Sequence, residues 1–265
     1  MPVIPEAILA TLDLADVSWH PILLDGLQKV AQADPLYLPE LAADADLPTN
    51  GRLLAAFSQP LGAVRYVLVG EGPYPRAASA TGVCFMDGAV GSLWSENGLS
   101  KAVNRATSLR NFIKMLLVAD GTLDANQTTG TSIANVGLAA LKENSERIQT
   151  LAELQQNLTA SGFLLLNASL VFRPHVAPIK DARAWGPFLM TVLKALATND
   201  LRIPTLVLWG KIAGQLGQLP ELGSFPRETA EHPYNLTFIQ NPQMQQFFRP
   251  MNLLKKVYPK AVIES

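Results

Sequence analysis

The sequence predicts an α/β fold built around a mainly parallel sheet. Three short apolar runs, over residues 65–70, 163–167 and 204–210, are each followed at once by small, polar or turn-forming residues. Continuous apolar runs of this kind are typical of parallel strands that are covered on both faces. Helix-length segments separate the runs, and strands that alternate with helices favour a parallel sheet with right-handed crossovers.

Three helices are expected between these strands, over residues 108–119, 147–161 and 184–198. The second is expected to end at Ser161, because the following Gly162 favours a helix stop. The third carries apolar residues at spacings close to three and four from Trp185 to Leu196, which predicts an amphipathic helix packed on a sheet. The Gly-, Thr- and Asn-rich stretch 120–135 is expected to form a mobile surface loop.

Length and composition favour one compact domain over residues 1–265. Hydrophobic residues make up 48% of the chain and charged residues only 16%, so a large buried core is expected and bulk disorder is excluded. The 18 glycines and 19 prolines are scattered along the chain, which excludes a low-complexity protein.

The charge and cysteine counts exclude several functional classes. The 21 basic residues nearly cancel the 22 acidic ones, which argues against a highly basic, sequence-independent nucleic-acid binder but allows a local basic groove. The single cysteine, Cys84, cannot form an internal disulfide, a four-cysteine zinc site or a cluster held by four thiolates. We therefore expect a reducing compartment, no metal and no cofactor.

The first residues and the hydropathy pattern indicate where the protein works. The start, MPVIPEAILATLDLADVSW, carries acids and no lysine or arginine before its apolar residues, unlike a secretory or transit peptide. No apolar run approaches the roughly 18 residues of a membrane span. We expect a soluble, cytoplasmic protein without membrane contact, and a monomer, because no pattern suggests an oligomer seam.

Candidate chemistry lies in the loops that follow the predicted strands. Ligands of parallel sheets bind at the carboxyl ends of the strands, which here are Gly70, Leu166 and Gly210. The turn at residues 70–75, GEGPYP, places the carboxylate of Glu71 beside an aromatic ring. Its glycines and prolines would allow a close approach to a ligand, although a simple tight turn explains them equally well.

Three further residues are candidates on chemical grounds. Phe85 places a second ring near the turn, Asn167 ends a strand with an amide that can read a ring edge, and His232 lies in a Pro-flanked turn. Each has a plain structural alternative: a core phenylalanine, an asparagine that caps a turn and a surface histidine.

Taken in order, the motifs resemble the uracil-DNA glycosylase superfamily, closest to the class with the motif Gly-Gln-Asp-Pro-Tyr-His. The matching segments are VRYVLVGEGPYPRAASATGVCF, SLRNFIKML, GFLLLNASLVF, LVLWGKIA and EHPYNLTF, with VSWHPILLDGL and RLLAAFSQPL similar to the leading helices. The resemblance spans residues 17–257. It implies a three-layer α/β/α sandwich with a central, mainly parallel four-stranded sheet.

The resemblance also implies an activity and roles for individual residues. The protein would flip uracil out of single- or double-stranded DNA, hydrolyse the N-glycosidic bond, release free uracil and so begin base-excision repair. Phe85 would stack on the base, Asn167 would read its Watson–Crick edge, and Tyr74 would close the pocket wall. His232 would donate to the uracil oxygen on which charge develops. Ser108, Lys211 and Thr237 would hold phosphates, and Leu236 would fill the gap in the duplex.

The turn departs from the family at the catalytic position. Gly72 occupies the place of the water-activating aspartate, Pro75 that of the motif's histidine, and Glu71 that of the glutamine. A branch marked by Gly-Glu-Ala-Pro-Gly has glutamate there, but it holds an iron–sulfur cluster through four cysteines. We expect Glu71 to align the water, with Gly72 lining the substrate site. The alternatives are a catalytically impaired protein that binds uracil-containing or single-stranded DNA, and a scaffold that no longer binds DNA.

Overall fold

The computed structural model describes residues 3–44, 46–198 and 202–257. The chain forms two compact units. The first, here called the sheet unit, comprises Met1–Ala89 and Gly162–His232, and the second, the helical unit, comprises Val90–Ser161 and Pro233–Ser265.

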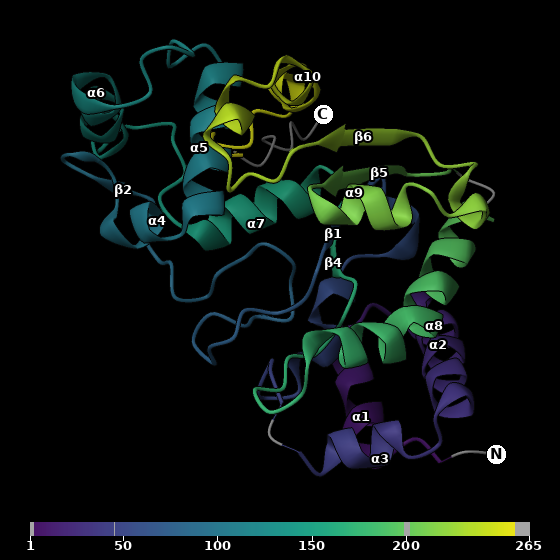
Figure 1. Ribbon diagram of the computed structural model, residues 1–265. Coiled ribbons are helices and arrows are strands. Elements are labelled where there is room, and N and C mark those ends of the chain that lie inside the picture. Colours follow the sequence, from purple (N-terminus) through teal and green to yellow (C-terminus); the bar gives the residue numbers. More distant parts are fainter. Residues whose placement is uncertain (1–2, 45, 199–201, 258–265) are drawn as a thin grey trace, which may run out of the picture. The chain divides into compact units, whose positions relative to one another are not determined.

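The sheet unit contains four parallel strands in the order β4-β1-β5-β6 (Figure 1). Their bounds are β1 (Tyr66–Gly70), β4 (Phe163–Asn167), β5 (Thr205–Trp209) and β6 (Arg227–Ala230). The predicted α/β fold, with a central parallel sheet of four strands flanked by helices, is confirmed. Within this four-stranded sheet, β6 was not predicted at the residue level, because this edge strand has the sequence RETA and carries no apolar run.

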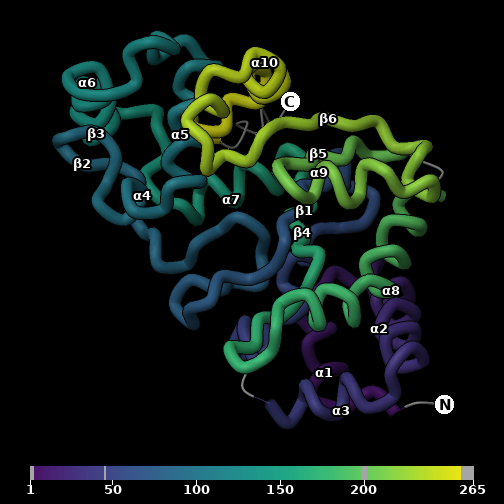
Figure 2. Tube along the Cα trace, viewed as in Figure 1, coloured from purple at the N-terminus to yellow at the C-terminus, as the bar shows by residue number. Residues whose placement is uncertain are grey.

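Two long helices of the sheet unit, α2 (His20–Ala33) and α8 (Pro178–Ala197), run side by side (Figure 2). A Cβ at Gly26 of α2 would lie only 2.7 Å from the Phe188 ring of α8, so glycine permits this close packing. The helix α8 begins six residues before the predicted start at 184. Its first turn opens with Pro178, which is well suited to the first helical position but belongs to no apolar repeat.

The apolar core of the sheet unit combines these helices with one face of the sheet. Val67, Val69 and Leu206 belong to the same buried cluster as Trp185 and Phe188. Fully burying one such side chain contributes about 1.5–3 kcal/mol. The alternate residues Leu68, Leu165 and Val207 are buried as well, so the strands are covered on both faces and the loops at their carboxyl ends are left for function. The remaining helices of the unit are α1 (Glu6–Leu9), α3 (Tyr37–Ala42), α9 (Lys211–Leu216) and the 3-10 helices at Ala10–Leu14, Val17–Trp19, Arg52–Phe57, Leu61–Ala63 and Pro220–Leu222.

The helical unit is built around α5 (Thr107–Ala119), against which α10 (Pro242–Phe248) and the 3-10 helix η6 (Leu236–Gln240) pack. Phe112 and Phe248 meet edge to face, with ring centroids 5.2 Å apart. The other elements are the antiparallel strands β2 (Trp94–Ser95) and β3 (Gly98–Leu99), the helices α4 (Lys101–Arg105), α6 (Gly130–Ala140) and α7 (Leu151–Ala160), and the 3-10 helix at Arg249–Met251.

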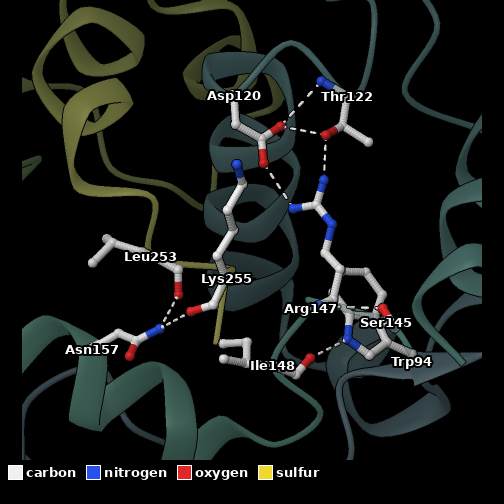
Figure 3. Close-up of polar contacts among 9 residues, drawn as sticks. All are labelled: Trp94, Asp120, Thr122, Ser145, Arg147, Ile148, Asn157, Leu253 and Lys255. Carbon is white, nitrogen blue, oxygen red and sulfur yellow. Dashed lines mark hydrogen bonds and ion pairs between the residues drawn. The ribbon is translucent and has the colours of Figure 1, made fainter. Parts of the chain in front are cut away.

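The predicted helix at 147–161 is confirmed from Leu151 onward but wrong in its first turn. Thr150 and Glu153 form a reciprocal capping box, which fixes the helix start. Residues before it make other contacts instead (Figure 3). Trp94 Nε1 donates to the Ile148 carbonyl oxygen at 2.6 Å, and Arg147 forms an ion pair with Asp120 at 2.7 Å.

The predicted loop at 120–135 is also partly wrong, because α6 begins at Gly130. The start of the stretch is anchored: Arg147 pairs with Asp120 and donates a hydrogen bond to Thr122 (Figure 3). The abundance of Gly, Thr and Asn concealed the apolar positions Ile133 and Val136, which face the interior of the helical unit.

Within the three described ranges, no helix is long and apolar enough to cross a membrane. Over the same part of the chain, no group of three or more His, Cys, Asp or Glu side chains is arranged to hold a metal ion.

Candidate active site

The ends of β1 and β4 bring the GEGPYP turn beside the residues that follow Asn167. Gly70 is in register with Asn167, and the pairing continues past the strands: Ala168 N donates to Gly70 O at 2.8 Å, and Ser169 N donates to Glu71 O at 3.1 Å. A Cβ at Gly72 would lie 3.6 Å from Ser169, which is ordinary van der Waals contact. Position 72 therefore has space for a side chain that faces Ser169.

Gly70 lets three chain segments converge. A Cβ at this residue would lie 2.5 Å from Cys84 Sγ and 3.0 Å from Asn167 Oδ1, so only glycine fits. Asn167 is buried, and Cys84 N donates to the Leu165 carbonyl oxygen at 3.0 Å. Burial raises the pKa of the Cys84 thiol to about 12, which keeps it neutral and unreactive at physiological pH.

Phe85 follows in a left-handed backbone conformation with φ of 67°. For a bulky residue this conformation costs about 1–3 kcal/mol, and such strain is concentrated at functional sites. The ring is partly exposed and meets Trp209 of β5 edge to face, with centroids 5.5 Å apart. The strained backbone and Trp209 thus hold the Phe85 ring at the end of the sheet.

Tyr74 is partly buried beside the same residues. Burial, and then the negative charge of Asp87, raise the pKa of its phenol above the usual range, so the ring stays neutral. Asp87 is itself buried and forms an ion pair with Arg76 at 3.6 Å. Tyr74 can therefore serve as an uncharged wall near Cys84.

His232 is brought to the carboxyl end of β5 by β6 and by Gly210. Gly210 N donates to Ala230 O at 3.0 Å, and a Cβ at Gly210 would lie 2.8 Å from His232 Cβ. Gly210 also has φ of 58°, a conformation that glycine adopts readily. Although His232 keeps an exposed part, the partial burial of its ring lowers its pKa, and the charge of Glu71 raises it by a smaller amount, so the neutral imidazole is favoured at pH 7.

A small cavity joins these side chains within the sheet unit. It measures about 30 Å³ and is bordered by Glu71, Phe85, Trp209 and His232. That volume has space for about one water molecule. The Glu71 side chain makes no hydrogen bond or ion pair within the described residues, so its carboxylate remains available to a water or a ligand.

The charge of Glu71 should be measurable at His232. We expect Glu71→Gln to lower the pKa of His232 further below 6.5, because the variant removes the charge that favours the imidazolium form. An NMR titration of the imidazole signals tests this. Glu221→Gln, at an exposed position of the sheet unit, should leave the His232 titration unchanged. A His232 pKa that rises or stays constant in Glu71→Gln would contradict the assigned interaction.

The other predicted residues occupy surface positions. Lys211 is exposed at the first position of α9. The remaining three belong to the helical unit: Ser108 lies in the first turn of α5, and Leu236 and Thr237 are exposed at the start of η6. Leu236 leaves 68% of its surface accessible, so its side chain is available to contact a ligand.

Asn111 holds the segment that precedes Leu236. Its Nδ2 donates to the Pro233 carbonyl oxygen at 2.7 Å and makes longer contacts with those of Tyr234 and Asn235, at 3.3 and 3.4 Å. Arg110 Nε donates to Asn111 Oδ1 at 3.2 Å, which fixes the orientation of the amide. Asn111 was not predicted from the sequence, although the segment SLRNFIKML contains it.

The fold and these residues define a parallel α/β protein with an aromatic, amide and imidazole site at the carboxyl edge of its sheet. A UNG crystal structure from Nitratifractor salsuginis is 41% identical, with a TM-score of 0.85 over 94% of this chain and 97% of that one. The chain belongs to the uracil-DNA glycosylase family.

More distant relatives carry the same family name or share the fold. A uracil-DNA glycosylase of Corynebacterium glutamicum is 28% identical over 83% of this chain and 80% of its own length. One from Nocardioides sp. is 26% identical over 83% and 79%. The crystal structure of mimivirus uracil-DNA glycosylase, 17% identical, shares the fold with a TM-score of 0.54 over 86% of this chain and 73% of that one. No protein-family model matches the chain.

Proposed function

We propose that this protein is a DNA glycosylase that flips uracil out of DNA and hydrolyses its N-glycosidic bond, the first step of base-excision repair. The observation that carries the proposal is the convergence of Glu71, Phe85, Asn167 and His232 at one edge of the sheet. The family membership supports it, because the relatives are named uracil-DNA glycosylases.

Base recognition is the first task of this site. Extruding a base costs a few kcal/mol, and stacking on an aromatic ring recovers roughly 1–3 kcal/mol. Phe85 provides that ring, and its strained backbone limits reorientation. The buried amide of Asn167 supplies one acceptor and two donors for the edge of uracil. Tyr74 forms the wall that meets the methyl group of thymine.

Bond cleavage is the second task. As the bond from the sugar C1′ to the uracil nitrogen breaks, its electron pair moves into the base and charge develops on a uracil oxygen. Neutral His232 donates a hydrogen bond to that oxygen. Glu71 aligns a water, whose oxygen bonds to C1′ while the proton passes to the carboxylate. Uracil leaves, and an abasic sugar remains in the DNA.

This chain is a divergent member of the class with the motif Gly-Gln-Asp-Pro-Tyr-His, because its turn has the sequence GEGPYP at that place. Glu71 borders the small cavity together with His232, whereas a side chain at Gly72 would face Ser169. The carboxylate next to the leaving base therefore comes from position 71. Gly72 contributes to the substrate site by leaving space.

Four residues are proposed to contact the DNA. Lys211 in the sheet unit, and Ser108 and Thr237 in the helical unit, hold phosphates, while Leu236 fills the gap left by the extruded base. The partner is uracil-containing DNA, single- or double-stranded, and free uracil is the product. We propose that residues 1–265 act as one domain and as a cytoplasmic monomer, which size-exclusion chromatography and cell fractionation test.

The proposed activity is tested with paired oligonucleotides that differ only in carrying deoxyuridine or thymidine at one position. We expect mass spectrometry to detect free uracil and an abasic strand from the first, and no thymine from the second. Retention of the deoxyuridine strand in a gel shift, without any abasic product, would overturn the enzyme proposal. That outcome would support the alternative function, a uracil-DNA binding protein. This alternative is considered because Gly72 replaces the water-activating aspartate of the family.

Asn111→Asp tests how the Leu236 segment is positioned. The variant keeps the size of the side chain but replaces the Nδ2 donor by an oxygen that faces three carbonyl groups. We expect uracil release from duplex DNA to fall about tenfold, because an unsatisfied buried contact costs about 1–3 kcal/mol. Release from single-stranded DNA should fall less, since no duplex gap must be filled.

Asn97→Asp is the matched control, because Asn97 is exposed in the β2–β3 turn of the same unit. It should leave both rates unchanged. Equal losses on single- and double-stranded substrates in Asn111→Asp would show that Asn111 supports the unit as a whole and does not position Leu236.

A further inference from the structure

A second, larger cavity of about 410 Å³ lies in the sheet unit, at the carboxyl ends of β1 and β4 and the start of α9. Its lining includes Gly72 and Ser169 from the loops after these strands, Lys211 and Gln215 of α9, and Ala182 of α8. Its volume falls in the range that holds small organic ligands. None of the roles proposed above uses most of its lining.

The lining suits a flat ligand with polar edges. Pro73, Val171 and Ile179 provide apolar surface, and Ser169 and Gln215 provide polar groups. Apolar walls with a few convergent polar groups are the usual composition of sites for small heterocycles.

The charges that border the cavity are balanced. Arg173 and Asp181 form an ion pair at 2.6 Å, with only 9% and 2% of their side chains exposed, and Tyr37 donates to the same carboxylate at 2.8 Å. Lys211 and Glu71 also border the cavity and carry opposite charges. Because positive and negative groups cancel, the cavity is not built for a free anion, and a neutral base fits it better.

The larger cavity shares lining residues with the candidate active site. Glu71 and Ile212 border both the 30 Å³ cavity beside His232 and the 410 Å³ cavity. A nucleotide whose base is held beside His232 is joined to its neighbour by one phosphodiester. The adjacent nucleotide of the same strand is therefore the group that can reach the larger cavity.

We propose that the larger cavity is a subsite for the base of the nucleotide adjacent to the uracil on the same DNA strand. This inference rests on the proposed function. It makes affinity depend on a base that undergoes no reaction, most strongly in single-stranded DNA, where that base is free of a pairing partner.

The test measures binding by fluorescence anisotropy with single-stranded oligonucleotides that contain 2′-fluoro-2′-deoxyuridine, whose electron-withdrawing fluorine resists bond cleavage. Three strands are compared: one intact, one abasic at the 5′ neighbour and one abasic at the 3′ neighbour. We expect the natural protein to bind the intact strand about tenfold more tightly than one of the abasic strands, as for other base contacts in single-strand binding.

Two variants fill the cavity from different walls, Ala182→Trp on α8 and Gln215→Trp on α9. In each, the preference for the intact strand should shrink towards one. Arg183→Trp is the matched control, since Arg183 is exposed on α8 and does not border the cavity, and it should keep the preference. Because the two filling variants are independent, the test still stands if one of them does not fold.

The outcomes separate this inference from the proposed function. Equal affinity of the natural protein for all three strands, or an unchanged preference in both filling variants, would overturn the subsite. Uracil release is measured separately on cleavable strands. A base-dependent preference without any uracil release would support the subsite and contradict the enzyme.

Discussion

Glu71→Gln should lower the single-turnover rate of uracil release by about 10²–10⁴-fold, the usual contribution of a positioned acid–base group. The substitution keeps the shape of the side chain but removes its charge and its ability to accept a proton. Glu71 borders the water-sized cavity beside His232, and its charge acts on that imidazole. DNA affinity should change little, because no role in holding DNA is assigned to this carboxylate.

The rate is measured with enzyme in excess over an end-labelled oligonucleotide, so that product release does not limit it. Glu221→Gln removes an exposed carboxylate from the same unit and should leave the rate unchanged. If Glu71→Gln released uracil at the same single-turnover rate as the natural protein, the assigned role of Glu71 would be refuted.

Adding Gly72→Asp to Glu71→Gln should not restore the lost rate. A Cβ at position 72 meets Ser169 at 3.6 Å, so the new side chain fits without displacing the backbone. It would face Ser169, whereas the carboxylate beside His232 comes from position 71. Recovery of a large part of the rate, with the fold intact, would show that a side chain at position 72 also reaches the attacking water.

His232→Leu should lower the rate by about 10²–10³-fold, the cost of removing one donor to a developing oxyanion. Leucine retains bulk at the end of β6 but cannot donate a hydrogen bond. Because burial lowers the pKa of His232, the neutral ring is the acting form at pH 7, and the loss should persist as the pH is raised above 6.5. A loss that disappears above that pH would instead identify the imidazolium as the active form.

His175→Leu provides the control for the loss of a histidine. The His175 ring is largely exposed and contacts Asp44 at 2.9 Å, away from the small cavity. This variant should keep the natural rate. Equal effects of the two substitutions would show that His232 acts on stability and not on the leaving base.

The fold was predictable where a strand is apolar and largely buried. β1, β4 and β5 are continuous apolar runs whose sequence identifies them directly. β6 could not be found in this way, because it lies at the edge of the sheet and is defined by its pairing with β5. The early start of α8 was missed for a related reason, since its first turn is largely exposed and shows no apolar period.

The site was predictable as a set of residue types but not as a set of contacts. Motifs singled out Glu71, Phe85, Asn167 and His232. The structure adds Gly210, whose missing side chain admits His232, and Trp209, which contacts Phe85. These partners lie far apart in the sequence, and the close approach of two backbones leaves no periodic signal.

The most direct test of the account is uracil release by the natural protein from an end-labelled single-stranded oligonucleotide under single-turnover conditions, read as alkali-labile strand breaks. The account predicts breaks at the uracil position, abolished when thymine replaces uracil. An intact strand that the protein still retains in a gel shift would contradict catalysis by Glu71 and His232.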